Sequence, residues 1–139
     1  MNEMYLTRLH EKKKTYPPRE AVLIVFQPYS YNPHAAFETA CHVVRWLTEL
    51  GYVVFSPILH THHYDQYWKH PNPVYGEIYY VWDLGLYERL LKGGSVAAVF
   101  LDGWENSPGC QFEHDWAVEN NVPCYKIHQI ETAVNMKRA

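Results

Sequence analysis

The chain of 139 residues lacks several features that would assign it to a special class of protein. No apolar run approaches the roughly 18 residues needed to cross a bilayer, and the polar first twenty residues lack the apolar centre of a signal peptide. Only three cysteines are present, without paired spacing, which is typical of a reducing compartment rather than a disulfide framework. Twelve basic and fifteen acidic residues give a net charge of -3, which offers no electrostatic basis for binding a nucleic-acid polymer. We therefore expect a cytoplasmic protein that binds neither membranes nor nucleic acid.

Aromatic residues are abundant by contrast, at 16% of the chain with 12 Tyr and 5 Trp. Tyrosine and tryptophan suit half-wet positions such as ligand pockets and subunit interfaces. Their number favours a protein with a small-molecule pocket, an interface with further copies of itself, or both.

Short apolar segments alternate with segments of helical periodicity. The segments that we expect to be strands are Ala21–Phe26, Tyr52–Pro57, Val96–Leu101 and Val122–Ile127. We expect one helix from Pro33 or His34 to Leu50 and a second from Gly76 to Lys92. A third helix should contain Glu113, and a short fourth should follow His128. Leu59–Tyr75, between the second strand and the second helix, is expected to be a long loop. Gly51 is well placed to end the first helix.

This alternation predicts an α/β fold, a three-layer doubly wound (Rossmann/flavodoxin-like) arrangement with a mostly parallel sheet of four or five strands. Residues 1–20, which end in Pro17-Pro18, are expected to be an N-terminal arm, and residues 21–139 a single domain.

Two carboxylates are candidates for catalysis. Glu113 is expected in the first turn of its helix, where backbone N–H groups favour an ionised carboxylate that could act as a nucleophile or simply stabilise the helix. Asp83 lies in the middle of a helix among aromatic residues. Partial burial would raise its pKa and make it a proton donor, whereas a solvated helix face would leave it without a role.

The turn between the third strand and the Glu113 helix has the composition of a binding site. Ser107 and Gly109 could offer a hydroxyl and a backbone N–H group to an anion, or serve as ordinary helix-capping residues. Tyr29 and Ser30 follow the first strand and should face the same crevice, because ligands of such sheets bind beyond the carboxyl ends of the strands.

Two other constellations give rival hypotheses. His60-Thr-His-His63 could bind zinc in a hydrolase, although it lacks the usual spacing of zinc ligands, and pocket or surface histidines are the alternative. Cys110 and His114 stand four residues apart at a helix start, where a thiol pKa can fall, but a buried cysteine is equally compatible with the pattern.

Several short motifs between Ala21 and Ile127 are similar to those of one superfamily. They are Gln27-Pro28-Tyr29-Ser30, Val54-Phe55-Ser56-Pro57, Asp83-Leu84, Gly103-Trp104, and Ser107-Pro108-Gly109 followed by Glu113. In this order and spacing they resemble the nucleoside 2-deoxyribosyltransferase-like superfamily, which includes the deoxynucleoside 5′-monophosphate N-glycosidases, and especially its small bacterial and phage members.

The resemblance implies that Glu113 attacks C1′ of the sugar and that Asp83 assists departure of the base. Ser107 stands where the resembled transferases carry an aspartate and the monophosphate hydrolases a serine, which favours a 5′-monophosphate substrate and water as acceptor. The other residues expected to bind substrate are Gln27, Tyr29, Ser30, Ser56, His60, Trp104 and Gly109, with Trp104 stacking on the base.

The resemblance also implies a homo-oligomer, a dimer or tetramer, that binds a nucleotide or nucleoside and needs no cofactor or metal. The first loop lacks the glycine-rich phosphate cradle of those hydrolases, since Gln27-Pro28-Tyr29 stands there. A non-catalytic nucleotide-binding module and a deoxyribosyltransferase are therefore the alternative interpretations.

Overall fold

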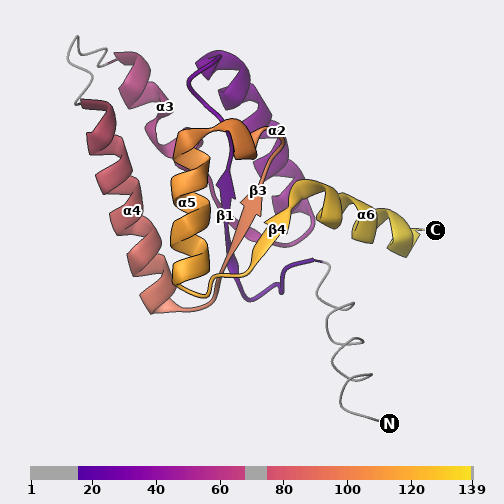
Figure 1. Cartoon of the computed structure of the whole chain (residues 1–139). Coiled ribbons are helices and arrows are strands. Elements are labelled where there is room, and N and C mark those ends of the chain that lie inside the picture. Colours follow the sequence, from indigo (N-terminus) through magenta and orange to yellow (C-terminus); the bar gives the residue numbers. More distant parts are fainter. Residues whose placement is uncertain (1–15, 68–74, 139) are drawn as a thin grey trace.

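The structure is a computed structural model that describes the backbone of residues 16–67 and 75–138 and the side chains of residues 16–64 and 82–135 (Figure 1). Its strands are β1 (Val22–Phe26), β2 (Val53–Phe55), β3 (Val96–Phe100) and β4 (Cys124–Lys126). Its helices are α2 (Pro33–Glu49), α3 (Pro57–Tyr67), α4 (Tyr75–Gly93), α5 (Pro108–Glu119) and α6 (Ile127–Arg138), with a short 3-10 turn, η1 (Trp104–Asn106). No helix within these ranges is both long and apolar enough to cross a bilayer.

The four strands form one parallel sheet in the order β2-β1-β3-β4, which confirms the predicted doubly wound α/β fold. Val22 of β1 pairs with Val53 on one side and with Val96 on the other. The chain therefore places β2 on one side of β1 and then crosses to the other side, where it forms β3 and β4. The switch point of such a sheet lies between β1 and β3, and ligands bind in the crevice beyond the carboxyl ends of these strands.

Alternating residues of β1 divide the core between the two faces of the sheet. Leu23 and Val25 pack on the side of Leu47 of α2 and Ile130 of α6. Ile24 and Phe26 pack on the other side, whose helical residues are Tyr87 of α4 and Trp116 and Ala117 of α5. Figure 1 shows the same division, with α4 and α5 on one side of the strands and α2 and α6 on the other. Because all of β1 and β3 except Val22 is fully buried, both strands read as continuous apolar runs.

Helix α2 begins and ends where capping residues stand in the sequence. Asn32 accepts a hydrogen bond from the backbone N–H of Ala35, and Pro33 opens the helix. Gly51 has a φ of +94°, and the N–H groups of Gly51 and Tyr52 donate to Thr48 and Leu47. This is the Schellman arrangement, and it confirms Gly51 as the predicted helix end.

Helix α3 overturns the prediction of a loop beginning at Leu59. The Oγ atom of Ser56 accepts from the N–H of Leu59 at 3.2 Å, its carbonyl accepts from His60 at 3.1 Å, and Pro57 occupies the first helical position. Ser56 and Pro57 thus begin a helix, and β2 is shorter than the predicted Tyr52–Pro57 strand for the same reason. The rest of the predicted loop, with Trp68 and His70, lies at residues 68–74, outside the described residues.

The end of the expected N-terminal arm packs on the domain. The hydroxyl of Tyr52 donates to the carbonyl of Pro17 at 2.7 Å, and the guanidinium of Arg19 lies 4.0 Å from the centre of the Tyr52 ring. Residues 16–20 are therefore continuous with the domain, and residues 1–15 lie outside the described part of the chain.

Candidate functional site

A tyrosine joins α4 to α5 at the centre of the candidate site. The hydroxyl of Tyr87 donates to Oε2 of Glu113 at 2.8 Å, and the Tyr87 side chain is 2% exposed. Its ring packs edge-to-face on Phe26, the last residue of β1, with ring centroids 5.3 Å apart. The Glu113 carboxylate is thereby held against the carboxyl end of the central strands.

Glu113 does not lie in the first helical turn, as the sequence led us to expect. Helix α5 begins at Pro108 with Ser107 as its N-cap, and its first turn contains no acidic residue. The expectation that the helix terminus keeps this carboxylate ionised is therefore wrong. The pKa of Glu113 is instead raised to about 8, mainly by burial and in part by the nearby Asp83, although the hydrogen bond from Tyr87 lowers it.

Asp83 is buried on the same side of the sheet, one helical turn before Tyr87. Its side chain is 8% exposed, which rules out the interpretation of a solvated helix face. Burial raises the pKa of Asp83 to about 7, in the direction predicted from its aromatic surroundings. Its Oδ1 atom is buried without a hydrogen-bond partner among the described residues. A buried oxygen left without a donor costs about 1–3 kcal/mol, a cost that is usual at functional sites.

The two carboxyl groups form an electrostatically coupled pair. Asp83 raises the pKa of Glu113, and both carboxylates raise the pKa of Tyr87. Because each negative charge disfavours the other, the pair retains a proton near neutral pH. Tyr87 donates to Glu113 and so favours its ionised form, but burial keeps the pKa of Glu113, about 8, no lower than that of Asp83, about 7, so the two carboxyl groups share one proton. One ionised and one protonated carboxyl group are what cleavage of a glycosidic bond requires.

Ser107 and Gly109 lie at the start of α5, shortly before Glu113 in the chain. The Ser107 hydroxyl accepts from the N–H of Cys110 at 3.4 Å, so it acts as the helix cap while its own proton remains available to a ligand. The Gly109 N–H has no hydrogen bond among the described residues. Gly103, at the entry to this turn, has a φ of +86°, a conformation that favours glycine.

His60 lies near the carboxylate pair, on the side of α4. Its ring contacts Trp82, the neighbour of Asp83, at 4.5 Å and Phe55 at 5.7 Å between centroids. Phe55 in turn contacts Tyr87. The Nε2 atom of His60 is buried and has no hydrogen-bond partner in the described part of the chain.

Other residues expected to bind substrate lie apart from the carboxylates or make structural contacts. The hydroxyl of Tyr29 bonds to Nδ1 of His62 at 2.7 Å, within a cluster between α2 and α3, and Ser30 is exposed. Ser56 is buried as the cap of α3. Trp104 stacks on His114 with centroids 4.7 Å apart, so this contact covers part of the indole that we expected to stack on a base.

Tyr87 is the site residue that the sequence did not assign. The available signal was its position four residues after Asp83, which places both side chains on one side of a helix. Its hydrogen bond to Glu113 could not be read from that spacing, because it depends on how α4 packs beside α5.

The rival constellations are not assembled as sites. His60 and His62 have different neighbours, Trp82 and Tyr29, and no group of three or more metal-ligating side chains is present among the described residues. The His70 part of that hypothesis lies outside them. Cys110 is fully buried, and burial raises the pKa of its thiol to about 12, which is the opposite of activation.

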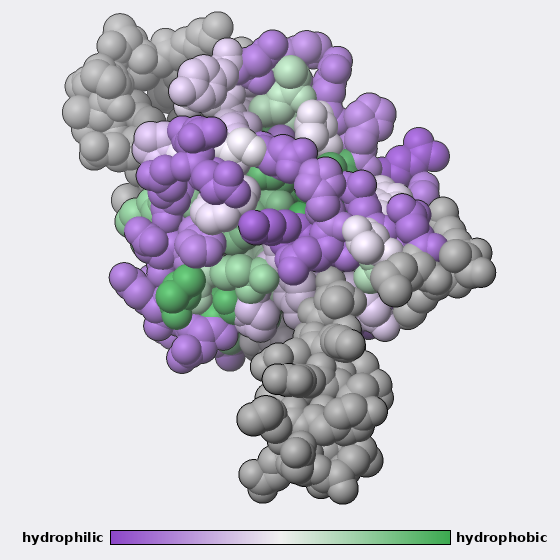
Figure 2. Space-filling model, turned by 45° about the vertical axis from the view of Figure 1, so that its right-hand side comes forward, coloured by the Kyte–Doolittle hydropathy of each residue, from purple (hydrophilic) through white to green (hydrophobic). Residues whose placement is uncertain are grey.

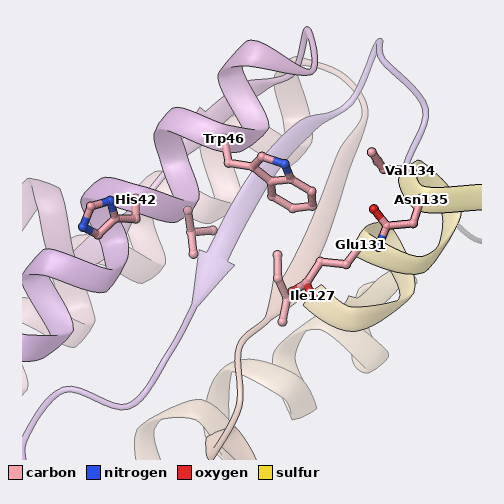
Figure 3. A pocket seen from close by; sticks show the side chains of 7 residues that line it. His42, Trp46, Ile127, Glu131, Val134 and Asn135 are labelled. Atoms are coloured by element: carbon pink, nitrogen blue, oxygen red, sulfur yellow. The ribbon is translucent and has the colours of Figure 1, made fainter. Parts of the chain in front are cut away.

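A hollow of about 370 Å³ lies between α2 and α6, on the face of the sheet opposite to the carboxyl pair (Figure 3). Trp46 and Ile127 contribute apolar surface to it, and His42, Glu131 and Asn135 contribute polar groups. Figure 2 shows a view of the molecule from nearer this side, where hydrophilic residues dominate and hydrophobic areas are small. None of the predicted site residues lines this hollow.

The fold and the carboxyl pair, with Asp83 buried and Glu113 half-buried, define a doubly wound α/β protein with an acid pair beside the carboxyl ends of its central strands. A family model described as a domain of unknown function (DUF1937) matches residues 25–128, so the chain belongs to that family. The matched range contains Asp83, Tyr87 and Glu113. No curated protein and no solved structure matches the chain. An assignment of function therefore depends on the site itself.

Proposed function

We propose that the protein is an N-glycosidase that cleaves the base–sugar bond of a nucleoside 5′-monophosphate or a related N-ribosyl compound. The observation that supports this most directly is the pair of the buried Asp83 and the half-buried Glu113, of which Glu113 receives a hydrogen bond from Tyr87. The similarity of the surrounding motifs to the nucleoside 2-deoxyribosyltransferase-like superfamily supports the same chemistry.

In the first step a carboxylate oxygen of Glu113 forms a bond to C1′ while the bond from C1′ to the base nitrogen breaks. The electron pair of that bond passes to the base, and the proton of Asp83 passes to the departing base. In the second step water attacks C1′, its proton returns to Asp83, and the carboxylate of Glu113 leaves. A base nitrogen placed at Asp83 favours the proton on that carboxyl group, which leaves the charge on Glu113.

The start of α5 is the proposed site for the 5′-phosphate. The unbonded N–H of Gly109 and the hydroxyl proton of Ser107 are donors, and the positive end of the helix dipole attracts an anion. A serine at this position avoids the repulsion that a carboxylate would exert on a phosphate, which favours hydrolysis of a monophosphate over transfer between nucleosides.

We also propose a cytoplasmic location and a homo-oligomeric state. The three cysteines form no disulfide, and Cys41 and Cys124 are exposed thiols, as in proteins of reducing compartments. Large apolar side chains such as Tyr64 and Trp82 are exposed on the α3–α4 side and are suited to an interface with a second copy.

Chromatography of free base released from a panel of nucleoside 5′-monophosphates tests the proposed activity. We expect Glu113→Gln and Asp83→Asn each to lower kcat at least about a hundredfold. Asp115→Asn and Glu88→Gln, at exposed positions of α5 and α4, are matched controls that should keep full activity. Equal base release by wild type and Glu113→Gln, or none from any nucleotide, would rule the proposal out, and tight nucleotide binding without release would identify a binding module.

A further inference from the structure

Gln27 has a buried side-chain amide directly after the end of β1, and only the NH2 group of this amide forms a hydrogen bond. It is 9% exposed, and its Nε2 group donates to the carbonyl of Ala36 in the first turn of α2 at 3.0 Å. Its Oε1 atom is buried with no hydrogen-bond partner in the part of the chain that the structure describes.

The contact with Ala36 fixes the polarity of the free half of the amide. A backbone carbonyl can only accept, so the atom facing Ala36 must be the NH2 group of Gln27 and the other must be its carbonyl oxygen. The free atom Oε1 is therefore an acceptor and needs a donor. Leaving such an oxygen buried without one costs about 1–3 kcal/mol, which a ligand donor can recover.

Gln27 stands between residues that contact both parts of the proposed site. Phe26, before it, packs against Tyr87, which holds Glu113. Pro28, after it, lies close to Gly103, since a Cβ atom built on Gly103 would be 3.3 Å from its Cγ atom. Gly103 belongs to the turn that leads to Ser107 and Gly109. Gln27 thus directly follows β1 at the switch point of the sheet, and its two neighbours in the chain contact the two parts of the proposed site.

We infer that Oε1 of Gln27 accepts a hydrogen bond from a hydroxyl or N–H group of the bound nucleotide, so that the end of β1 selects a ligand carrying a donor there. The inference rests on the proposed function, because it assumes a nucleotide in this crevice. It also excludes the phosphate from this position, since a phosphate oxygen and an amide oxygen are both acceptors and would repel each other. The donor is either a sugar hydroxyl or the exocyclic amino group of the base.

Calorimetric binding to the Glu113→Gln protein, which should bind without turnover, tests the inference. The ligands are a nucleoside 5′-monophosphate and its analogues without the 2′-hydroxyl, without the 3′-hydroxyl, and without the exocyclic amino group. We expect one analogue to bind roughly tenfold or more weakly than the parent, and the analogue concerned identifies the donor. If all analogues bind within twofold of the parent, the inference is overturned without any substitution at Gln27.

Gln27→Met in the Glu113→Gln background then assigns the effect to the amide. This change also removes the bond to Ala36, but that loss affects all ligands equally, whereas loss of the acceptor abolishes only the preference for the ligand with the donor. Gln27→Glu, which keeps acceptor oxygens, should keep the preference. If Gln27→Met keeps the preference for the ligand with the donor, the inference is wrong but the proposed function is unaffected. If the wild type releases no base and no nucleotide binds, the proposed function is wrong.

Discussion

At the scale of single residues, the hydroxyl of Tyr87 stabilises the ionised form of Glu113. Its hydrogen bond to Glu113 lowers a pKa that burial and Asp83 raise. We predict that Tyr87→Phe moves the pKa of Glu113 still higher and shifts the acidic limb of the pH–rate profile toward higher pH. Carbon-13 NMR titration of the glutamate carboxyl groups measures the same shift without depending on activity.

Tyr125→Phe is the matched control for this change. Tyr125 is also buried, but it packs on the opposite face of the sheet, in the cluster with Leu47 and Ile130. It should lose little activity and leave the Glu113 titration where it is. A Tyr87→Phe protein whose Glu113 titrates as in wild type would contradict the assigned role of the hydroxyl.

Residue-scale inference from the sequence identified the two carboxyl groups but not their environment. The predicted burial of Asp83, with a pKa raised by it, is confirmed in its direction. Glu113 was expected to be ionised by a helix terminus, yet it lies in the second turn, where burial dominates. Neither the bond from Tyr87 nor the orientation of the Gln27 amide is visible in sequence spacing, because both depend on contacts between separate elements.

At the scale of elements, α3 shows what a search for apolar periodicity misses. The helix lacks an apolar stripe and is rich in histidine, so its sequence pattern predicts a loop. Its start was nevertheless encoded by Ser56 as N-cap and Pro57 as first residue.

We predict that Ser56→Ala lowers the free energy of unfolding by about 1 kcal/mol, the usual cost of losing an N-cap. Ser56→Thr keeps the capping hydroxyl and should retain most of the stability. Urea denaturation followed by circular dichroism measures both. An equal loss in the two variants would mean that burial of Ser56, rather than capping, is what matters.

The turn between β3 and α5 depends on Gly103. A side chain at this position must adopt a φ of +86° and would bring its Cβ atom to 3.3 Å from Pro28. We predict that Gly103→Ala lowers the free energy of unfolding by about 1–2 kcal/mol. Gly94→Ala is the control, because a Cβ atom there would meet nothing within 4 Å. Thermal unfolding compares them, and equal melting temperatures for the two variants would contradict the prediction.

At the scale of the whole molecule, the fold followed from the sequence because its central strands are apolar throughout. Val96–Phe100 is buried at every residue, so it reads as a parallel strand covered on both faces. The short edge strands carry a weaker signal: β2 has the exposed residue Val53, and in β4 only Tyr125 is buried. The apolar segments do not determine the order of the strands in the sheet, and so they do not determine where the crevice lies.

The carboxyl pair should also make the stability of the entire protein depend on pH. Asp83 and Glu113 have folded-state pKa values of about 7 and about 8, above their ordinary values of 3.8 and 4.5. Between about pH 4 and pH 8 the folded state therefore binds more protons than the unfolded state, so the free energy of unfolding falls as pH rises through this range. We predict that the double variant Asp83→Asn/Glu113→Gln loses this dependence. It should match wild type near pH 4 and exceed it at pH 9 by several kcal/mol, with an upper limit of about 9 if both pKa shifts contribute in full at about 1.4 kcal/mol per unit.

Guanidinium denaturation of both proteins at a series of pH values from 4 to 9 measures the difference. His128, whose pKa is raised by the neighbouring Asp102, also titrates, but it is the same in both proteins and its effect cancels when their curves are subtracted. Asp115→Asn, at an exposed position of α5, should reproduce the wild-type curve. A double variant that is less stable than wild type at pH 9 would show that the carboxylates stabilise the fold. A more stable one would show that the chain retains two destabilising acids, as expected when a site is kept for its chemistry.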